Sequence, residues 1–210
     1  MNIAIIGASA GVGLLCVERA LERKHQVIAL SRNTETLPSH PDLSIIKGSA
    51  TNAADLKRAI EHADAVIVAL GTGSSTKATT LYSDAAATLI QVQKELGSTV
   101  PFIVLTGFGA GNSGQYQNWF LKLLFKLLLG AIYQNKTRME ELIAGSAIRW
   151  EFVRPGMLTN KPRSEKYRVE TKYRKGMNIG GIARADVADF LVKQAENPTE
   201  LGRYPALSNK

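Results

Sequence analysis

A strand, a glycine-rich loop and a helix open this chain, and this order constrains its fold more than any other feature. The apolar residues 3–6 lead directly into Gly7-Ala8-Ser9-Ala10-Gly11-Val12-Gly13, and a helical pattern follows over residues 12–23. Glycine allows a sharp turn and a close approach of backbone to ligand, and a helix N-terminus offers N–H donors to a phosphate. We therefore expect a dinucleotide to bind on Gly7, Ser9, Ala10, Gly11, Val12 and Gly13. The alternative is an ordinary βα turn that uses glycine only for its conformation.

Short β-branched and apolar runs alternate with helical patterns along the first two thirds of the chain. Strands are predicted at residues 26–31, 43–47, 65–70, 101–105 and 150–154, with helices between them at 53–61, 78–97 and 134–145. Uninterrupted apolar strands of this kind are buried on both faces of a parallel sheet. A length of 210 residues suits one such domain. We predict an α/β fold, with a Rossmann-type doubly wound parallel sheet in a single domain over residues 1–210.

Two segments, 107–133 and 156–184, fall outside this alternation, and we expect them to form the substrate side of the domain. Residues 107–117 are rich in glycine, and residues 118–133 form an apolar helix that carries two lysines. This run is too short and too interrupted by lysine to cross a bilayer, which takes about 20 residues. It could pack against the body or cover a substrate cleft, form a dimer surface, or contact a membrane surface. The second segment is a small C-terminal lobe before a helix at 185–197.

The charge of the chain is uneven. Lys and Arg number 26 against 18 Asp and Glu, for a net charge of +8, and residues 161–175 alone hold seven basic and two acidic side chains. This segment has three interpretations: a nucleic-acid contact in which Tyr167 and Tyr173 stack on bases, a lobe that attracts an anionic acceptor, or a solvated hairpin. In the hairpin, Tyr167, Val169, Thr171 and Tyr173 share one side of an alternating strand. We favour the hairpin and rank nucleic acid last.

Cysteine and histidine are too sparse for a disulfide framework or a metal site. Cys16 is the only cysteine, and His25, His40 and His62 are scattered. No internal disulfide can form and no zinc-ligand spacing occurs, so we expect no metal. Cys16 is interpreted as a packing residue of the first helix. No basic side chain precedes the apolar N-terminal run, which argues against a signal peptide and for a cytoplasmic protein.

The end of the second strand bears on the choice of dinucleotide. NAD-type sites place an Asp or Glu there to hold the ribose 2′-hydroxyl, whereas this strand ends Leu30-Ser31-Arg32-Asn33. In the absence of a repelling carboxylate, Ser31 and Arg32 can bind a 2′-phosphate, which suits the arginine guanidinium. NADP(H) is therefore favoured over NAD(H). The alternative is that Arg32 is a solvated loop charge.

Several further motifs resemble those of one family. They are ADAVIVALGT at 63–72, Lys136-x-x-x-Glu140, VRPGMLT at 153–159 and IARADVA at 182–188. Together with the glycine loop they resemble the short-chain dehydrogenase/reductases over nearly the whole chain. Within that superfamily they are similar to the atypical NAD(P)H-binding branch, which includes biliverdin reductase B, a flavin reductase, and the NmrA-like proteins.

The resemblance implies a set of site residues. Leu70-Gly71-Thr72 would pack on the adenosine ribose, and Gly48 would lie near the adenine. Thr106 would face the nicotinamide, Lys136 would hold the nicotinamide ribose hydroxyls, and Pro155-Gly156-Met157 would line the carboxamide end. These assignments place the residues at the carboxyl edge of the parallel sheet, where open α/β sheets bind ligands. The alternative for the lysine is an exposed side chain paired with the glutamate one turn on.

The chain departs from the family pattern at the acid/base pair. The Tyr-x-x-x-Lys motif needs a tyrosine one helical turn before the lysine, so that the ammonium lowers the pKa of the phenol. Ile132 occupies that position, and Tyr133 is about 100° away around the helix. The hydroxyl at the end of the fifth strand is Thr106. The candidate catalytic residues are therefore Lys136, Thr106 and Tyr133.

An acceptor that takes hydride without a protein acid fits these departures. A flavin or quinone can be protonated by solvent, because the cofactor carries the chemistry and the protein positions it. We expect an NADPH-dependent oxidoreductase that passes hydride to a small flat acceptor held under residues 107–133, with Trp119 and Phe120 above it. The alternative is a non-catalytic NADP(H) sensor of the NmrA-like type. The protein is expected to be a monomer or a homodimer.

Overall fold

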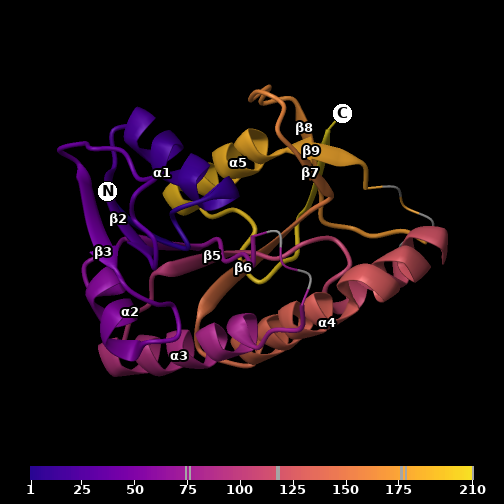
Figure 1. Cartoon of the computed structure of the whole chain (residues 1–210), viewed down its shortest axis with the longest axis horizontal. Helices are drawn as coiled ribbons and strands as arrows, with labels where there is room; N and C mark the ends of the chain where they lie inside the picture. The colour runs from indigo at the N-terminus through magenta and orange to yellow at the C-terminus, as the bar shows by residue number, and fades with distance from the viewer. Residues whose placement is uncertain (74, 76, 117–118, 176, 178, 210) are drawn as a thin grey trace.

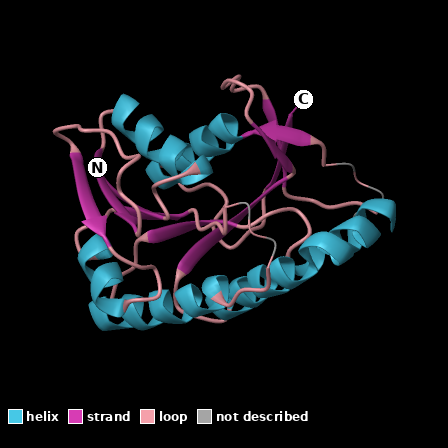
Figure 2. Ribbon diagram, viewed as in Figure 1, coloured by secondary structure: helices cyan, strands magenta, loops and turns pink. Residues whose placement is uncertain are grey.

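In the part of the chain that it describes, the computed structural model forms an eight-stranded sheet with helices on both faces (Figures 1 and 2). It describes residues 1–73, 75, 77–116, 119–175, 177 and 179–209, and in the helix that begins at Trp119 it describes side chains from residue 130 onward. The strands are β1 (Asn2–Ile6), β2 (Gln26–Ser31), β3 (Leu43–Lys47), β4 (Ala65–Val68), β5 (Pro101–Leu105), β6 (Arg149–Pro155), β7 (Met157–Thr159), β8 (Tyr167–Glu170), β9 (Gly181–Ala183) and β10 (Ala206–Asn209). The helices are α1 (Gly11–Glu22), α2 (Ala53–Ile60), α3 (Leu81–Leu96), α4 (Trp119–Ala144) and α5 (Arg184–Glu196), with a 3-10 helix η1 (Gly111–Tyr116) before α4.

The strand order is that of a doubly wound sheet. From edge to edge the strands run β3, β2, β1, β4, β5, β6, β10 and β8, and neighbouring pairs are parallel except for β10 and β8. The chain moves outward from β1 to β3 and then returns to β4 on the other side of β1. This return creates a switch point between β1 and β4 at the carboxyl edge. The predicted Rossmann-type α/β fold in a single domain is confirmed.

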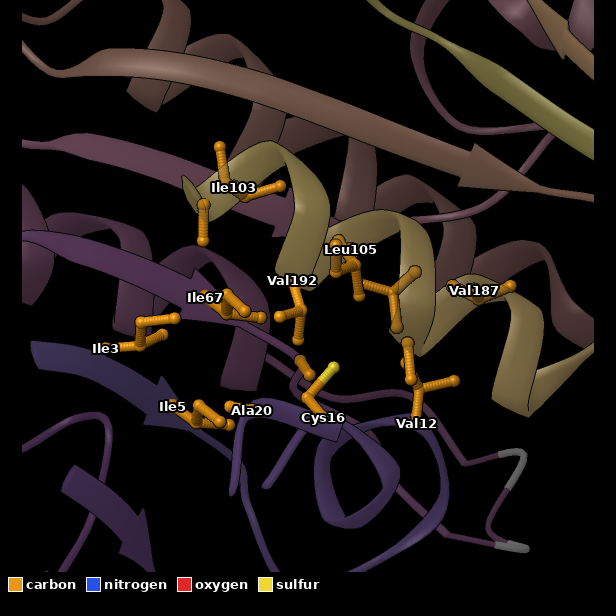
Figure 3. Close-up of a cluster of buried hydrophobic side chains, with 14 of the residues drawn as sticks. Ile3, Ile5, Val12, Cys16, Ala20, Ile67, Ile103, Leu105, Val187 and Val192 are labelled. Atoms are coloured by element: carbon orange, nitrogen blue, oxygen red, sulfur yellow. The ribbon is translucent and has the colours of Figure 1, made fainter. Parts of the chain in front are cut away.

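Alternate residues of the central strands fill two hydrophobic layers. Ile3 and Ile5 of β1 lie on the side covered by α1 and α5, whereas Ala4 and Ile6 lie on the side covered by α2, α3 and α4. Because both faces are buried, the strand sequences are continuous apolar runs. Figure 3 shows the first layer, with Cys16 of α1 among the aliphatic side chains. Burial raises the pKa of the Cys16 thiol, and the residue packs the core as expected.

Residues 119–144 form one helix rather than two. α4 runs alongside α3 without interruption, so the predicted boundary between residues 133 and 134 is wrong. The change from apolar to polar composition suggested that boundary, but no proline interrupts the segment, and Gly130 within a helix costs only about 1 kcal/mol. The side chains of Trp119 and Phe120 lie outside the described residues. No helix of the described residues has both the length and the apolar stretch that crossing a membrane requires.

Sequence periodicity did not predict the short strands β7, β9 and β10. β7 pairs with β9 in a separate two-stranded sheet, and β10 inserts between β6 and the edge strand β8. Asp186 in the first turn of α5 accepts hydrogen bonds from Ser164 N at 2.7 Å, Ser164 Oγ at 2.9 Å and Glu165 N at 2.8 Å. These bonds fix the loop before β8 to α5. Contacts between such distant segments leave no periodic signal in the sequence.

The tyrosines of the basic segment 161–175 pack against the protein in different directions. β8 ends three residues before Tyr173, so the predicted single face from Tyr167 to Tyr173 is wrong. Tyr167 Oη donates to Asp189 of α5 at 3.0 Å, whereas the Tyr173 ring packs edge to face on Phe108 at 5.5 Å. Stacking on nucleic-acid bases requires exposed rings. The two rings of this segment are engaged with the body of the protein instead.

Candidate functional site

A cleft of about 860 Å³ opens at the carboxyl edge of the sheet. It is lined by the loops after β1, β2, β3, β4 and β5 and by residues of α3 and α4. The carboxyl ends of parallel strands meet at one edge, so residues far apart in the sequence share this cavity. Most of the residues proposed from the sequence line it: Gly7, Ser9, Ala10, Gly11, Val12, Ser31, Arg32, Gly48, Leu70, Gly71, Thr72, Thr106, Tyr133 and Lys136.

The glycine loop requires glycine at two positions for different reasons. Gly7 has φ +90°, and a Cβ there would lie 2.7 Å from the carbonyl oxygen of Ala69. Gly13 lies beneath the loop, where a Cβ would overlap the Gly7 carbonyl. Gly13 is not part of the described lining, and its role is to let α1 approach β1 closely.

The first turn of α1 is open toward the cleft. Ala10 at the N-cap makes no side-chain hydrogen bond to the helix, and the first turn contains no acidic residue. The backbone N–H groups at this end, near Gly11 and Val12, are therefore not capped by side chains. They lie at the positive end of the helix dipole, which favours a phosphate as ligand.

The end of β2 brings a hydroxyl pair and an arginine to one end of the cleft. Ser31 Oγ donates to Ser9 Oγ at 2.6 Å, which links β2 to the glycine loop. Arg32 is exposed at the rim, and within the described part of the chain it forms no ion pair with a carboxylate. Its planar guanidinium can therefore contact an anionic ligand.

Lys136 is half-buried in the same cleft, next to two tyrosines. Its Nζ donates to the Thr106 carbonyl at 2.7 Å and lies 5.3 Å from the ring centre of Tyr82 and 5.4 Å from that of Tyr133. Burial lowers the pKa of Lys136 to about 8, although Glu140 acts in the opposite direction. The alternative of an exposed lysine paired with Glu140 is wrong, because the lysine points into the cleft and the glutamate pairs elsewhere.

Tyr133 and Tyr82 form the walls around this lysine. Tyr133 Oη lies 2.9 Å from the position that a Cβ would take at Gly107, and burial raises the pKa of Tyr133 to about 12. Tyr82, in the first turn of α3, is almost fully buried, and its side chain is hydrogen-bonded to Thr72. The sequence alone does not identify Tyr82 as a site residue, because an amphipathic helix pattern does not show which residue of its first turn faces a ligand cleft.

Asn135, the neighbour of Lys136, holds the start of α3. Its Oδ1 accepts from the backbone N–H of Tyr82 at 2.9 Å and of Ser83 at 3.2 Å, and its Nδ2 donates to Ser83 Oγ at 2.8 Å. Thr80, the N-cap of α3, makes no side-chain cap. Asn135 therefore satisfies donors that the end of the helix leaves unpaired, and it joins α3 to α4.

A buried polar network lies behind Lys136. Thr106 Oγ1 donates to Glu140 Oε1 at 2.7 Å, and Arg154 forms an ion pair with the same glutamate at 2.6 Å. The Arg154 guanidinium also lies over the Tyr204 ring, 4.2 Å from its centre. The Thr106 hydroxyl is therefore directed into the protein, and its carbonyl oxygen is the atom that contacts Lys136. Glu140 and Arg154 each belong to one of the family motifs, but their pairing was not predicted from the sequence.

The turn Pro155-Gly156-Met157 lies outside the described lining of the cleft. A Cβ on its glycine would overlap the Gly180 carbonyl, and the Met157 side chain is 72% exposed. Leu158 and Arg184 line the cleft near this turn instead. The position of Arg184 in the cleft was not predicted, since in the periodic pattern this residue is only the start of the last helix.

The described lining of the cleft carries positive charge only. Arg32, Lys136 and Arg184 are its cations, and it contains no Asp or Glu. A concave site with charges of one sign concentrates ligands of the opposite sign. The described residues also bring together no group of three or more His, Cys, Asp or Glu side chains that could hold a metal ion. The cleft therefore suits a polyanionic organic ligand such as a dinucleotide.

The sequence matches that of one protein family over most of its length. Residues 7–198 match the NAD(P)H-binding family, and this range includes every residue that lines the cleft. The chain therefore belongs to the NAD(P)H-binding family. The resemblance expected from the motifs is confirmed at this level.

Solved structures share the fold over essentially the whole chain. ChuY from Escherichia coli O157:H7, described as an anaerobilin reductase, is 22% identical with a TM-score of 0.78, over 100% of this chain and 97% of its own. A candidate NADH-flavin reductase from Streptococcus pneumoniae TIGR4 is 24% identical with a TM-score of 0.77, over 100% of both chains. A short-chain dehydrogenase/reductase from Veillonella parvula in complex with NADP is 16% identical with a TM-score of 0.83, over 99% and 94%. These likenesses show a common fold.

A shorter match relates the chain to a 3-beta-hydroxysteroid dehydrogenase from Mycolicibacterium neoaurum. The two sequences are 34% identical over 65 residues, which is 31% of this chain and 18% of that relative. Since the match spans less than a fifth of the relative's length, it carries no assignment of substrate.

Proposed function

We propose that this protein is an NADPH-dependent oxidoreductase that passes hydride to a small, flat acceptor. The observation that carries the proposal is the composition of the cleft. It combines an uncapped helix N-terminus behind a glycine loop, Arg32 at its rim and Lys136 beside two tyrosines, with no acidic side chain in the described lining. Membership of the NAD(P)H-binding family supports the dinucleotide, and Arg32 and Ser31 support NADPH.

In the proposed orientation, the adenosine end of the cofactor lies toward β2 and the nicotinamide end lies toward Lys136. The first turn of α1 would bind the diphosphate, and the end of β2 would bind the 2′-phosphate through Ser31 and Arg32. Leu70-Gly71-Thr72 would flank the adenosine together with Gly48. Lys136 would then reach the ribose of the nicotinamide. The Veillonella parvula relative has the same fold and was solved in complex with NADP, which supports a dinucleotide with a 2′-phosphate.

The cofactor supplies the hydride when bound. The residues of this chain would position the nicotinamide against the acceptor ring and deliver, or admit from solvent, the one proton that completes the reduction. Lys136 remains largely protonated at pH 7, because its pKa of about 8 lies above that value, and its ammonium can donate to a ribose hydroxyl as well as to Thr106. Tyr133 stays neutral at this pH, because its pKa is raised to about 12. The proton that completes reduction of the acceptor comes from Tyr133 or from solvent.

Two structural relatives support a flat acceptor. One is described as an anaerobilin reductase and another as a candidate NADH-flavin reductase. A flavin accepts hydride on a planar ring and can be protonated by solvent, so it does not require the Tyr-x-x-x-Lys pair. The rings of Tyr82 and Tyr133 give this end of the cleft apolar walls of matching shape.

A non-catalytic NADP(H) sensor of the NmrA-like type is the second candidate. The observation that favours it is the direction of the Thr106 hydroxyl, which donates to the buried Glu140 and not to the cleft. Ile132 also stands where the family places its acid, four residues before Lys136. A site of this kind can bind the cofactor tightly without turning it over.

Steady-state oxidation of NADPH with FMN, riboflavin and menadione as acceptors separates the two candidates. Turnover above the rate without protein, and its loss in Lys136→Met, would support the reductase. The matched control is Lys94→Met, which neutralises an exposed lysine of α3 and should leave the rate unchanged. Tight NADPH binding with no turnover on any acceptor would contradict the reductase and support the sensor.

A further inference from the structure

Arg184 has no part in the cofactor arrangement proposed above, although it lines the same cleft. It is the first residue of α5 and lines the cleft together with Leu158 of β7, the strand that pairs with β9 just before α5. Its side chain is half-buried, whereas Arg32 is exposed at the rim. The cleft therefore holds a partly desolvated guanidinium away from the end of β2.

The partners of Arg184 are neutral. Its Nη1 donates to Asn160 Oδ1 at 2.7 Å and more weakly to the Leu158 carbonyl at 3.4 Å. Two other arginines with little exposure pair with carboxylates: the buried Arg154 pairs with Glu140, and the half-buried Arg19 pairs with Asp189. No carboxylate of the described residues lies within ion-pair distance of Arg184.

The nearest acidic residue in the sequence does not compensate the charge. Asp186, two residues further along α5, directs both carboxylate oxygens to the backbone and hydroxyl donors of Ser164 and Glu165. A half-buried cation without a counter-ion is less well solvated than an exposed one, and an anionic ligand would compensate its charge. A guanidinium with unused N–H donors matches the two oxygens of a carboxylate or phosphate.

We propose that Arg184 binds an oxyanion of the ligand that occupies the cleft. The identity of that ligand rests on the proposed function. This oxyanion is either the diphosphate of the dinucleotide or a phosphate or carboxylate on the acceptor. If the group belongs to the acceptor, Arg184 selects anionic acceptors over neutral ones of the same ring system.

Two variants test the proposal by different means. Arg184→Gln removes the charge, while Asn160→Asp keeps Arg184 and places a carboxylate against its guanidinium, where it would compete with the ligand. Arg149→Gln is the matched control, since Arg149 is an exposed arginine whose Nη1 donates to the Thr99 carbonyl at 3.0 Å, at the opposite end of β6. Thermal unfolding establishes that each variant is folded. If Arg184→Gln is not, Asn160→Asp alone decides.

The readout is the Kd of NADPH and, on protein saturated with NADP⁺, the Kd of FMN and of riboflavin. We expect both test variants to raise one of these Kd values about tenfold or more, the size of one charge-assisted hydrogen bond. A higher Kd for NADPH would mean that Arg184 binds the diphosphate of the cofactor. A higher Kd for FMN but not for riboflavin would mean that it binds the phosphate of the acceptor. If wild-type protein binds neither flavin, NADPH alone decides.

Unchanged Kd values for NADPH and FMN in both test variants would overturn the proposal, as would an equal rise in Arg149→Gln. Because the Kd values are measured without turnover, they test the role of Arg184 separately from the proposed reductase function. A wild-type protein that binds NADPH but reduces no acceptor would refute that function, and the Kd values would still decide the role of Arg184.

Discussion

Glu140 and Arg154 form a buried ion pair through two hydrogen bonds. Arg154 Nη2 lies 2.6 Å from Glu140 Oε2, and Nε lies 3.1 Å from Oε1. The two side chains are 3% and 1% exposed. The same carboxylate accepts the hydroxyl of Thr106, the residue whose carbonyl contacts Lys136. The position of a lysine in the cleft therefore depends on a charge pair that lies outside it.

Breaking this pair should destabilise the fold strongly. Glu140→Gln leaves Arg154 buried without a counter-charge and should lower the free energy of unfolding by about 3–5 kcal/mol. The neighbouring Glu141 provides the control, because it pairs with Arg138 at 3.2 Å on the surface. Glu141→Gln should change the free energy by less than about 1 kcal/mol. Urea unfolding measures both, and similar losses in the two variants would contradict the expectation.

Arg32→Ala should separate the two dinucleotides. If Arg32 binds the 2′-phosphate, the variant loses about tenfold or more in affinity for NADPH and little for NADH, which lacks that group. Arg149→Ala, which removes an exposed arginine far along the sheet, should affect neither. Fluorescence titration with both nucleotides supplies the Kd values. Equal losses for NADPH and NADH would remove the 2′-phosphate assignment.

The charge of Lys136 should make cofactor affinity depend on pH. Burial lowers its pKa to about 8, so the ammonium is present below that value and is lost as the pH rises through it. NADPH, an anion, should therefore bind more weakly at pH 9 than at pH 7. Lys136→Met should bind weakly at both values with a flatter profile, while Lys94→Met should follow the wild type. A wild-type Kd that is constant from pH 7 to 9 would argue against a contact between this ammonium and the cofactor.

Glu151 should make the stability of the fold depend on pH. It is fully buried on β6, neither carboxylate oxygen has a hydrogen-bond partner among the described residues, and burial raises its pKa to about 8, with a contribution from Glu200. The native state therefore keeps a proton that the unfolded chain loses above its ordinary pKa of 4.5. Stability should fall by roughly 2–5 kcal/mol as the pH rises from about 4.5 to about 8.

Glu151→Gln should remove most of that slope, because the amide does not titrate. Glu18→Gln, at an exposed position of α1, should keep the wild-type slope. Guanidinium unfolding at pH 5 and pH 8 gives the comparison. The contradicting outcome is a wild-type protein whose free energy of unfolding changes between pH 5 and pH 8 by the same amount as that of Glu151→Gln. That result would show that water or a conformational change solvates this carboxyl.

Local patterns predicted the first half of the fold closely. β2, β3 and β5 begin and end where the apolar runs indicated. β2 and β5 are largely buried and differ sharply in composition from their loops, whereas β3 is a more exposed edge strand that was still marked by its apolar run. The glycine loop was equally informative, since Gly7 and Gly13 meet backbone atoms that no side chain could avoid. At such positions the local backbone geometry permits only glycine, so the residue type predicts the geometry.

Features that depend on distant contacts were not predictable in this way. α4 continues through a change of composition because its backbone hydrogen bonds do not depend on polarity. The position of Arg184 is held by a hydrogen bond to Asn160, which lies 24 residues earlier in the sequence. Tyr82 faces the cleft because Asn135 of α4 fixes the first turn of its helix. None of these relationships follows a period of two or of 3.6 residues, so hydrophobic periodicity does not reveal them.

The hydrogen bonds of Asn135 have a mechanical consequence. Asn135 grips the first turn of α3, where Tyr82 contacts Thr72, and the next residue along α4 is the lysine that contacts Thr106. A displacement of this turn of α4 would therefore move Lys136 and the first turn of α3, with Tyr82, at the same time. The contact of Tyr82 with Thr72 after β4 and that of Lys136 with Thr106 after β5 are thus mechanically coupled through α4.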